Sequence, residues 1–160
     1  MSGYKLMLKG IHHVYGNKGD LNVRDGEFLA IVGASGCGKS TLLNIMCGMI
    51  EPTQGEVLID GESVSNGKHR IGYISQTDTL LPWRKIESNV ALGLEIEGMS
   101  KKERLEQARR MIALSGMEGF EKKYPYELSG GMRKRAVIIR ALVQNPDIIF
   151  MDEPFGPLDV

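Results

Sequence analysis

Runs of apolar residues separated by turn signals predict the strands of this chain. Residues 4–32 carry short apolar segments and turn signals at residues 17–19 and at Asp25-Gly26, a pattern typical of short antiparallel strands. Phe28–Val32, the last of these segments, is apolar throughout and is expected to form a strand. Further strands are predicted over residues 56–59, 69–75 and 148–151, and the last of them, being wholly apolar, is expected to be buried on both faces.

Apolar positions at helical spacing predict the helices. One helix is expected from Ser40 to Met49, stopping at Gly48, which suits a left-handed cap. A helical pattern covers residues 85–117, where Ser100 and Glu103 have the spacing of a capping box. Two apolar stripes are expected to pack into the core: Leu105, Ala108, Met111 and Ile112, and then Met132, Ala136, Ile139 and Val143 in a helix that Pro146 ends.

Between the run at 28–32 and the first helix lies the pattern G-x-x-x-x-G-K-[ST], a phosphate-binding loop. Its glycines let backbone N–H groups approach a phosphate, and the helix start adds a favourable dipole. Lys39 would place a positive charge on the β/γ-phosphate oxygens, and Ser40 would offer a hydroxyl to Mg²⁺. The motif indicates a nucleoside triphosphate without selecting one. The candidate nucleotide-binding residues are Gly33, Ser35, Gly36, Cys37, Gly38, Lys39, Ser40 and Thr41.

Two acidic residues end the apolar strand at 148–151. Ligands bind at the carboxyl ends of strands in open α/β sheets, so Asp152 and Glu153 are expected at such an edge. Asp152 can hold the Mg²⁺ that bridges phosphates, and Glu153 can accept a proton from an attacking water. Alone the pair is weak evidence; with an upstream phosphate loop it indicates triphosphate hydrolysis.

Ser129-Gly130-Gly131 stands at the start of the last predicted helix. Serine suits the N-cap, and two glycines permit close approach of a ligand to the backbone. The segment is therefore either a second anion-binding helix start or an ordinary capped helix.

Composition narrows the class of protein. Lys plus Arg and Asp plus Glu balance at 20 each, so no net field favours nucleic acid or an acidic membrane surface. No apolar stretch reaches the roughly 18 residues of a membrane span, and the N-terminus has no signal-like region, so we expect a soluble cytoplasmic protein. Cys37 and Cys47 are ten positions apart, about 15 Å along a helix, and are expected to be reduced thiols.

The chain resembles the nucleotide-binding subunit of ABC transporters in the order of these motifs, with Gln76 lying between the phosphate-binding loop and Leu128–Met132. The resemblance implies an α/β phosphate-loop NTPase of the ABC type, with a parallel core sheet, an antiparallel N-terminal subdomain and a helical subdomain at roughly 85–145. Residues 1–160 would form one such domain. Family members run on well past this length, so the chain is expected to be C-terminally truncated, with an incomplete core that lacks one central strand and a histidine that contacts the γ-phosphate.

The resemblance also implies roles for particular residues. Tyr15 matches the aromatic residue that stacks on adenine, and Asp159 matches an aspartate that crosses the dimer interface. Gln76 matches a glutamine that contacts Mg²⁺ and water and links to the membrane subunit. The implied catalytic residues are Glu153, Gln76 and Lys39; the implied Mg²⁺ ligands are Ser40, Gln76 and Asp152; and the implied cofactors are ATP and Mg²⁺.

In the family two subunits meet head to tail, and each ATP lies between the phosphate loop of one and the Ser-Gly-Gly of the other. The implied partners are a second copy or a paired ABC subunit, integral membrane permease subunits and, indirectly, a substrate-binding protein, with no nucleic acid. The expected location is the inner face of the cell membrane. The segment Leu80-Leu81-Pro82-Trp83 resembles the branch of the family that imports nitrate, sulfonate or taurine. Two alternatives stay open. One is a soluble ABC ATPase without a transport role that serves nucleic-acid repair or the ribosome; against it, Arg133-Lys134-Arg135 is expected to be a helix surface rather than a nucleic-acid patch. The other is a nucleotide-binding module without turnover.

Overall fold

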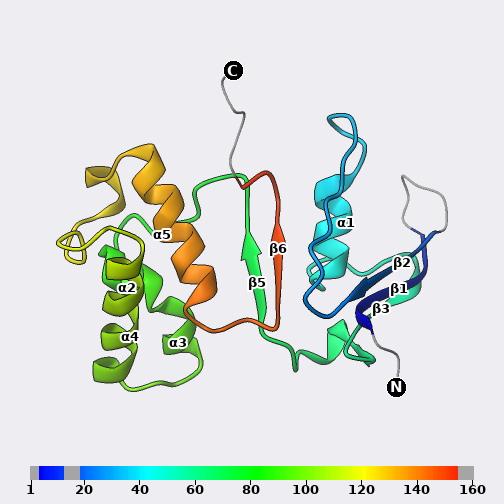
Figure 1. The fold of residues 1–160 in the computed structure, drawn as a ribbon, viewed down its shortest axis with the longest axis horizontal. Coiled ribbons are helices and arrows are strands. Elements are labelled where there is room, and N and C mark those ends of the chain that lie inside the picture. Colours follow the sequence, from blue (N-terminus) through cyan, green and yellow to red (C-terminus); the bar gives the residue numbers. More distant parts are fainter. Residues whose placement is uncertain (1–3, 13–18, 155–160) are drawn as a thin grey trace. The chain divides into compact units, whose positions relative to one another are not determined.

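The structure, a computed structural model, describes residues 4–12 and 19–154. It divides into two compact units, Met1–His69 and Arg70–Val160 (Figure 1). The predictions for Tyr15 and Asp159 fall outside the described residues. No helix in the described part of the chain is long and apolar enough to cross a membrane.

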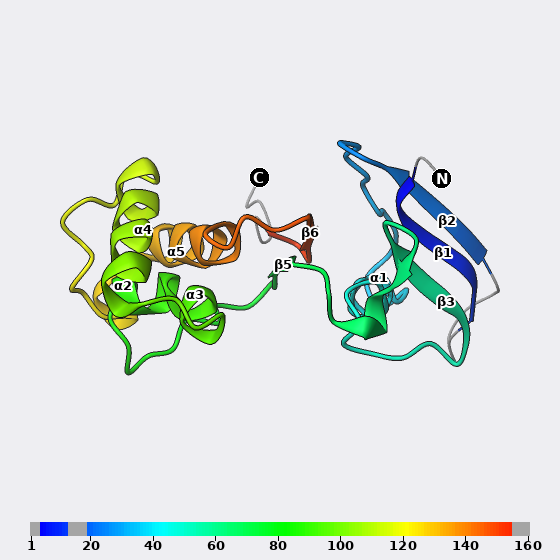
Figure 2. The same ribbon diagram turned by 90° about the horizontal axis from the view of Figure 1, so that it is seen from below.

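The first unit is built on a four-stranded antiparallel sheet of order β2-β1-β3-β4 (Figure 2). Its elements are β1 (Tyr4–His12), β2 (Gly19–Arg24), α1 (Lys39–Met46), β3 (Gln54–Ile59), β4 (Glu62–Ser63) and the 3₁₀ helix η1 (Val64–Asn66). Alternate or adjacent apolar residues of β1 and β3 are buried, among them Leu6, Leu8, Val57 and Ile59. This confirms the antiparallel N-terminal part of the expected fold.

One glycine shapes the centre of this sheet. Gly55 has φ +93°, and a Cβ built there would lie 2.5 Å from the carbonyl oxygen of Lys9 on β1. The register between β1 and β3 shifts at the same place, between Lys9 and His12. Only glycine allows the two backbones to approach this closely.

A Schellman turn ends α1. The N–H of Met49 bonds the carbonyl of Asn44 at 2.8 Å, and the N–H of Gly48 bonds that of Ile45 at 3.0 Å. Gly48 has φ +77°, as expected for the left-handed cap. The helix is therefore shorter than predicted, since it ends at Met46 rather than Met49.

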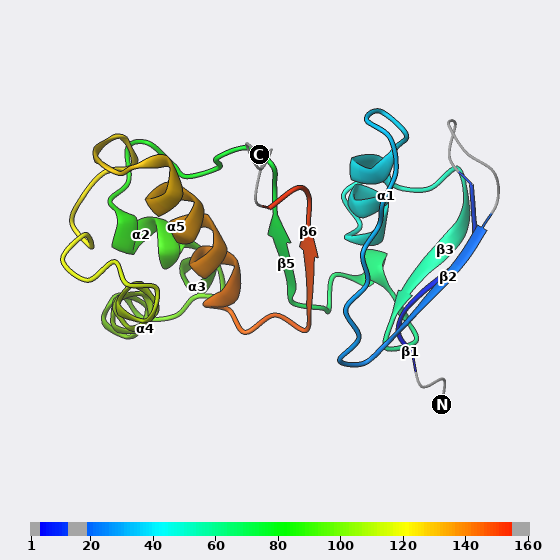
Figure 3. The ribbon, with the colours of Figure 1, turned by 45° about the horizontal axis from the view of Figure 1, so that its top comes forward.

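The second unit joins a two-stranded parallel sheet to a group of helices (Figure 3). The strands β5 (Ile71–Ile74) and β6 (Ile148–Met151) pair in register. The helices are α2 (Ile86–Val90), α3 (Leu92–Ile96), α4 (Lys101–Leu114), η2 (Pro125–Glu127) and α5 (Gly130–Leu142). Ala108, Ile112 and Ala136 are fully buried in the shared core, with Leu105, Met111 and Met132 packed against it, which confirms both predicted stripes.

The helical pattern at 85–117 is divided into three helices. Ala91 ends α2 and begins α3, and Gly98, at φ +82°, follows the end of α3. Ser100 then caps α4 and accepts a bond from the Glu103 N–H at 3.4 Å, as predicted. The return bond differs from the capping box: the Glu103 carboxylate accepts from the Ser100 hydroxyl at 2.5 Å.

Two strand predictions need correction. Phe28–Val32 has no regular structure, and Phe28 and Val32 are 87% and 91% exposed. A strand needs a neighbour for its backbone groups, and neither sheet of the described residues includes this run. In β6 only Phe150 is buried, and Met151 is 40% exposed, because β6 pairs with β5 alone in the described chain. The parallel sheet is therefore smaller than expected.

Candidate functional site

The phosphate loop folds into a tight turn at the start of α1. Gly36 and Gly38 have φ +75° and +97°, conformations that favour glycine. Gly38 is the N-cap of α1, and no side chain caps the helix. The positive end of the helix dipole therefore faces the loop, which suits an anion.

The Lys39 ammonium lies over this loop. Its Nζ donates to the carbonyl oxygens of Gly33 at 2.9 Å and Ala34 at 3.0 Å, and the Cys37 Sγ lies 4.0 Å away. A Cβ on Gly33 would come within 2.7 Å of that sulfur, so glycine makes room for the Cys37 side chain. Both cysteines are free, as predicted, and Cys37 is exposed.

At the carboxyl ends of β5 and β6, Gln76 and Glu153 meet. The Asp152 N–H donates to the Ile74 carbonyl at 2.8 Å. This bond extends the parallel pairing of β5 and β6 by one residue beyond the end of β6. The Gln76 side-chain amide then donates to the Glu153 carboxylate, with Nε2 to Oε2 at 2.7 Å. Glu153 has φ +46°, an uncommon backbone conformation for a residue with a Cβ.

Ser129 caps α5 as its sequence position predicts. Its hydroxyl accepts from the Met132 N–H at 3.3 Å. Gly130 and Gly131 are exposed, and a Cβ built on Gly131 would meet no heavy atom within 4 Å. The start of α5 is thus open to a ligand or partner.

The basic run at 133–135 lies on the surface of α5, and its side chains make specific contacts that the sequence did not identify. Arg133 pairs with Asp78, with Nε to Oδ2 at 2.9 Å. Lys134 reaches the backbone of Ser75, and the Arg135 guanidinium donates to the Ser115 carbonyl at 2.9 Å. These contacts were missed because their acceptors lie 20 or more residues away along the chain.

Farther along α5, Arg140 faces the same segment, and burial lowers the pKa of its guanidinium while the Asp78 charge opposes that change. Its Nη1 donates to the Thr79 carbonyl at 2.7 Å. The segment that follows Gln76 is therefore held against α5 by several cations.

Buried Asn89 fixes the loop that follows. Its side chain accepts from the Leu81 N–H at 2.7 Å and donates to the carbonyls of Leu81 at 3.0 Å and Arg84 at 2.9 Å. Trp83, between them in sequence, is 71% exposed. The Arg84 guanidinium also pairs with Glu95 at 2.7 Å, and this hydrogen bond is the main cause of the lowered pKa of Glu95.

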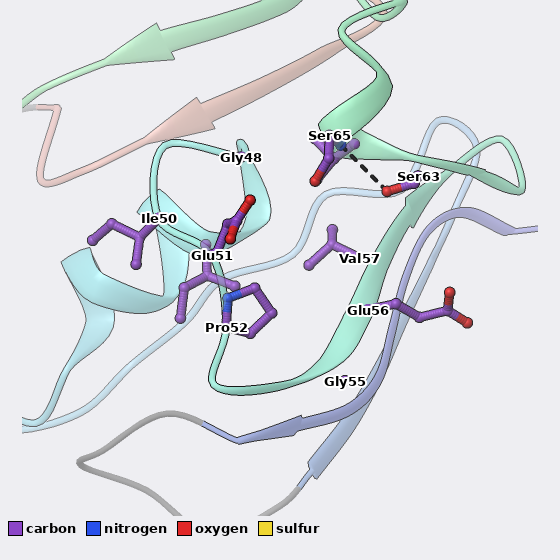
Figure 4. Close-up of a pocket in the computed structure, with 11 residues that line it drawn as sticks. Gly48, Ile50, Glu51, Pro52, Gly55, Glu56, Val57, Ser63 and Ser65 are labelled. Atoms are coloured by element: carbon purple, nitrogen blue, oxygen red, sulfur yellow. Dashed lines mark hydrogen bonds between the residues drawn. The ribbon is translucent and has the colours of Figure 1, made fainter.

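A cavity of about 210 Å³ lies at the other end of α1 from the phosphate loop (Figure 4). The last turn of α1, β3 and η1 form its walls. Its lining includes the polar residues Glu51, Ser63 and Ser65, and the Ser65 N–H donates to the Ser63 hydroxyl at 3.4 Å, which caps η1. It contains none of the predicted site residues.

Comparison with known proteins assigns the family. Residues 17–156 match the model of the ABC transporter family. The chain is 49% identical over 140 residues to MJ0412 of Methanocaldococcus jannaschii, named an uncharacterized ABC transporter ATP-binding protein, covering 88% of this chain and 52% of that one. It is 41% identical over 157 residues to the taurine import ATP-binding protein TauB of Escherichia coli K12, covering 93% and 62%.

A solved structure agrees with these relatives. The ATP-binding cassette MJ0796, in a dimeric post-hydrolysis state bound to ADP and Pi, superposes with a TM-score of 0.85 at 34% identity, over 96% of this chain and 76% of that one. The chain spans about half to three fifths of the length of the curated relatives cited above. These matches confirm the expected α/β phosphate-loop fold, and the chain belongs to the ABC transporter family.

Proposed function

We propose that the chain binds Mg·ATP and hydrolyses it as part of the ATP-binding subunit of a transporter. The observation that carries the proposal is the phosphate loop, which combines two left-handed glycines, an α1 start without a side-chain cap and a Lys39 ammonium bonded to the loop backbone. Lys39 now bonds two loop carbonyls, and a phosphate could take their place as its partner.

The nucleotide fits the donors of this loop. Backbone N–H groups of Gly33, Ser35, Gly36, Cys37 and Gly38, followed by Lys39, Ser40 and Thr41, would hold the phosphates. Tyr15 would stack on the adenine.

Magnesium also fits the residues assigned to it. The Ser40 hydroxyl, the Gln76 amide oxygen and the Asp152 carboxylate are hard oxygen donors of the kind that Mg²⁺ prefers. When bound, the metal would neutralise charge that develops on the transferred phosphoryl group.

Glu153 would act as the general base. Its carboxylate would accept a proton from the attacking water, and Gln76, which already bonds it at 2.7 Å, would orient that water and the base. The open α5 start, with Ser129, Gly130 and Gly131, would contact the ATP of a second subunit. The dimeric MJ0796 structures support the pairing of two subunits.

The transport role rests on relatives. TauB is named a taurine import ATP-binding protein, so import of a small anion such as taurine, another sulfonate or nitrate is the proposed process. The proposed partners are a second ABC subunit, integral membrane permease subunits and, through them, a substrate-binding protein, at the cytoplasmic face of the membrane. A single domain over 1–160 with a helical subdomain near 85–145 remains the proposed organisation.

Steady-state ATP hydrolysis by the wild-type chain, Lys39→Ala and Glu153→Gln tests this function. We expect Mg²⁺-dependent phosphate release by the wild type, loss of ATP binding in Lys39→Ala, and ATP binding with dimerisation but no turnover in Glu153→Gln. ATP binding without turnover by the wild type would favour the alternative of a nucleotide-binding module. Absence of ATP binding would overturn the proposal.

A further inference from the structure

Three cations of α5, Arg133, Lys134 and Arg140, contact the segment that carries Gln76. The Lys134 ammonium on α5 donates to the carbonyl oxygens of Ser75 at 3.2 Å and Gln76 at 3.4 Å. Farther along α5, Arg140 donates to Thr79. Between these points the segment runs from the end of β5 along the side of α5.

The three contacts act on different residues. The Arg133 guanidinium pairs with the Asp78 carboxylate at 2.9 Å, and Arg140 reaches Thr79. The Lys134 contact is the one of the three that reaches the backbone of Gln76 itself. Of these three contacts it therefore lies nearest to the Gln76 side chain.

The Gln76 side chain needs such an anchor. Gln76 and Glu153 are both exposed, and an exposed hydrogen bond between flexible side chains gains little over bonds to water. Fixing a glutamine side chain also costs conformational entropy. Charge-assisted bonds from the partly buried Lys134 ammonium already hold this backbone. Less conformational entropy therefore remains to be lost when the Gln76 side chain is fixed.

We propose that Lys134 is a positioning residue that holds the Gln76 backbone so that the Gln76 amide is directed onto Glu153. The contacts form one chain: α5, which Ser129 caps, then Lys134, the Gln76 backbone, the Gln76 amide and the Glu153 carboxylate. If a binding partner displaced the α5 start, Gln76, which is hydrogen-bonded to the general base, would thereby move. The catalytic part of this inference rests on the proposed function of Glu153; the positioning part does not.

The decisive test is spectroscopic and needs no turnover. The Gln76 side-chain amide is identified in ¹H–¹⁵N spectra of the full chain by its loss in Gln76→Ala. Glu153→Ala should move this signal in the wild-type background, because the carboxylate acceptor is removed. In a Lys134→Met background the same change should move it by less than half as much, and in Lys134→Arg by nearly the full amount.

Kinetics supply a second readout. Removal of a general base or its alignment costs up to about 10²–10⁴-fold, so partial misalignment in Lys134→Met should lower kcat about tenfold. KM for ATP should stay within about twofold, because the proposal leaves the phosphate loop unchanged, and Lys134→Arg should recover most of kcat. Lys102→Met, at an exposed lysine on α4, is the matched control and should behave as wild type.

Each result decides a different point. An undiminished response of the Gln76 signal to Glu153→Ala in Lys134→Met would overturn the positioning role. The expected spectra without any wild-type hydrolysis would sustain the positioning role and contradict the proposed function. If Lys134→Met does not fold, Lys134→Gln, which keeps a donor without the charge, replaces it in both experiments.

Discussion

The loop that presents Trp83 depends on a single buried amide, and Asn89→Asp tests that dependence while conserving shape. Asn89 is 0% exposed. Its Nδ2 donates to the carbonyls of Leu81 and Arg84 at 3.0 and 2.9 Å, and its Oδ1 accepts from the Leu81 N–H. Aspartate keeps the acceptor and removes both donors.

The expected cost follows from those two lost donors. Each net hydrogen bond contributes about 1 kcal/mol, and the Arg84 carbonyl, left without its donor, costs about as much or more, whereas the Leu81 carbonyl keeps the N–H of Arg84 at 3.1 Å. A buried carboxylate facing two carbonyls adds a desolvation penalty, against a somewhat stronger bond from the Leu81 N–H. We expect a loss of about 3 kcal/mol in the free energy of unfolding.

Urea unfolding measures this loss. With a slope of about 2 kcal/mol per molar urea, the midpoint should fall by about 1.5 M. Circular dichroism reports the helices, and the single tryptophan, Trp83, reports the loop itself. Gln107→Glu, the same amide-to-acid change at an exposed site on α4, should shift the midpoint by less than about 0.3 M. Equal midpoints for the two variants would refute the role assigned to Asn89.

Three further outcomes are expected. Gly55→Ala should destabilise the chain by about 2 kcal/mol more than Gly61→Ala: both glycines have positive φ, but only at Gly55 would a Cβ meet a backbone carbonyl, at 2.5 Å, and equal urea midpoints would contradict this. Maleimide should label exposed Cys37 well before Cys47, whose thiol pKa is raised by burial, and mass spectrometry of peptides would reveal the opposite order. The pKa of Glu127 is lowered by hydrogen bonds from a backbone N–H and then a lysine, so its contribution to stability is present at neutral pH and lost as pH falls through the folded-state value. Glu127→Gln should therefore lower Tm at pH 7, and the difference should shrink only once the pH falls below the ordinary glutamate pKa and through the lowered folded-state value; a pH-independent difference would contradict the ionic origin.

Local signals predicted much of the second unit. Ser129 and Ser100 cap their helices because a serine before a helix can reach N–H groups two or three residues ahead. The stripe through Ala108 and Ile112 is buried because it forms one face of a helix. Such features depend on residues within about one helical turn along the chain, so the sequence alone is enough to predict them.

Features that depend on distant partners were predicted less well. Phe28–Val32 has the composition of a strand, but strand formation requires a neighbouring backbone that composition cannot specify. Likewise, the sequence places the cations at 133–135 on a helix surface but does not identify their acceptors, which come from segments near Ser75 and Ser115. The Gln76–Glu153 contact joins residues 77 positions apart, and only the parallel pairing of β5 with β6 brings them together.

The central claim is that this phosphate loop binds Mg·ATP, and thermal unfolding with and without Mg·ATP tests it most directly. At 100 times its Kd, ATP should add about 2.7 kcal/mol to the free energy of unfolding. For a chain of this size that corresponds to a rise in Tm of roughly 5–10 °C, which should be absent in Lys39→Ala. An unchanged Tm in the wild type, or an equal rise in Lys39→Ala, would contradict the account.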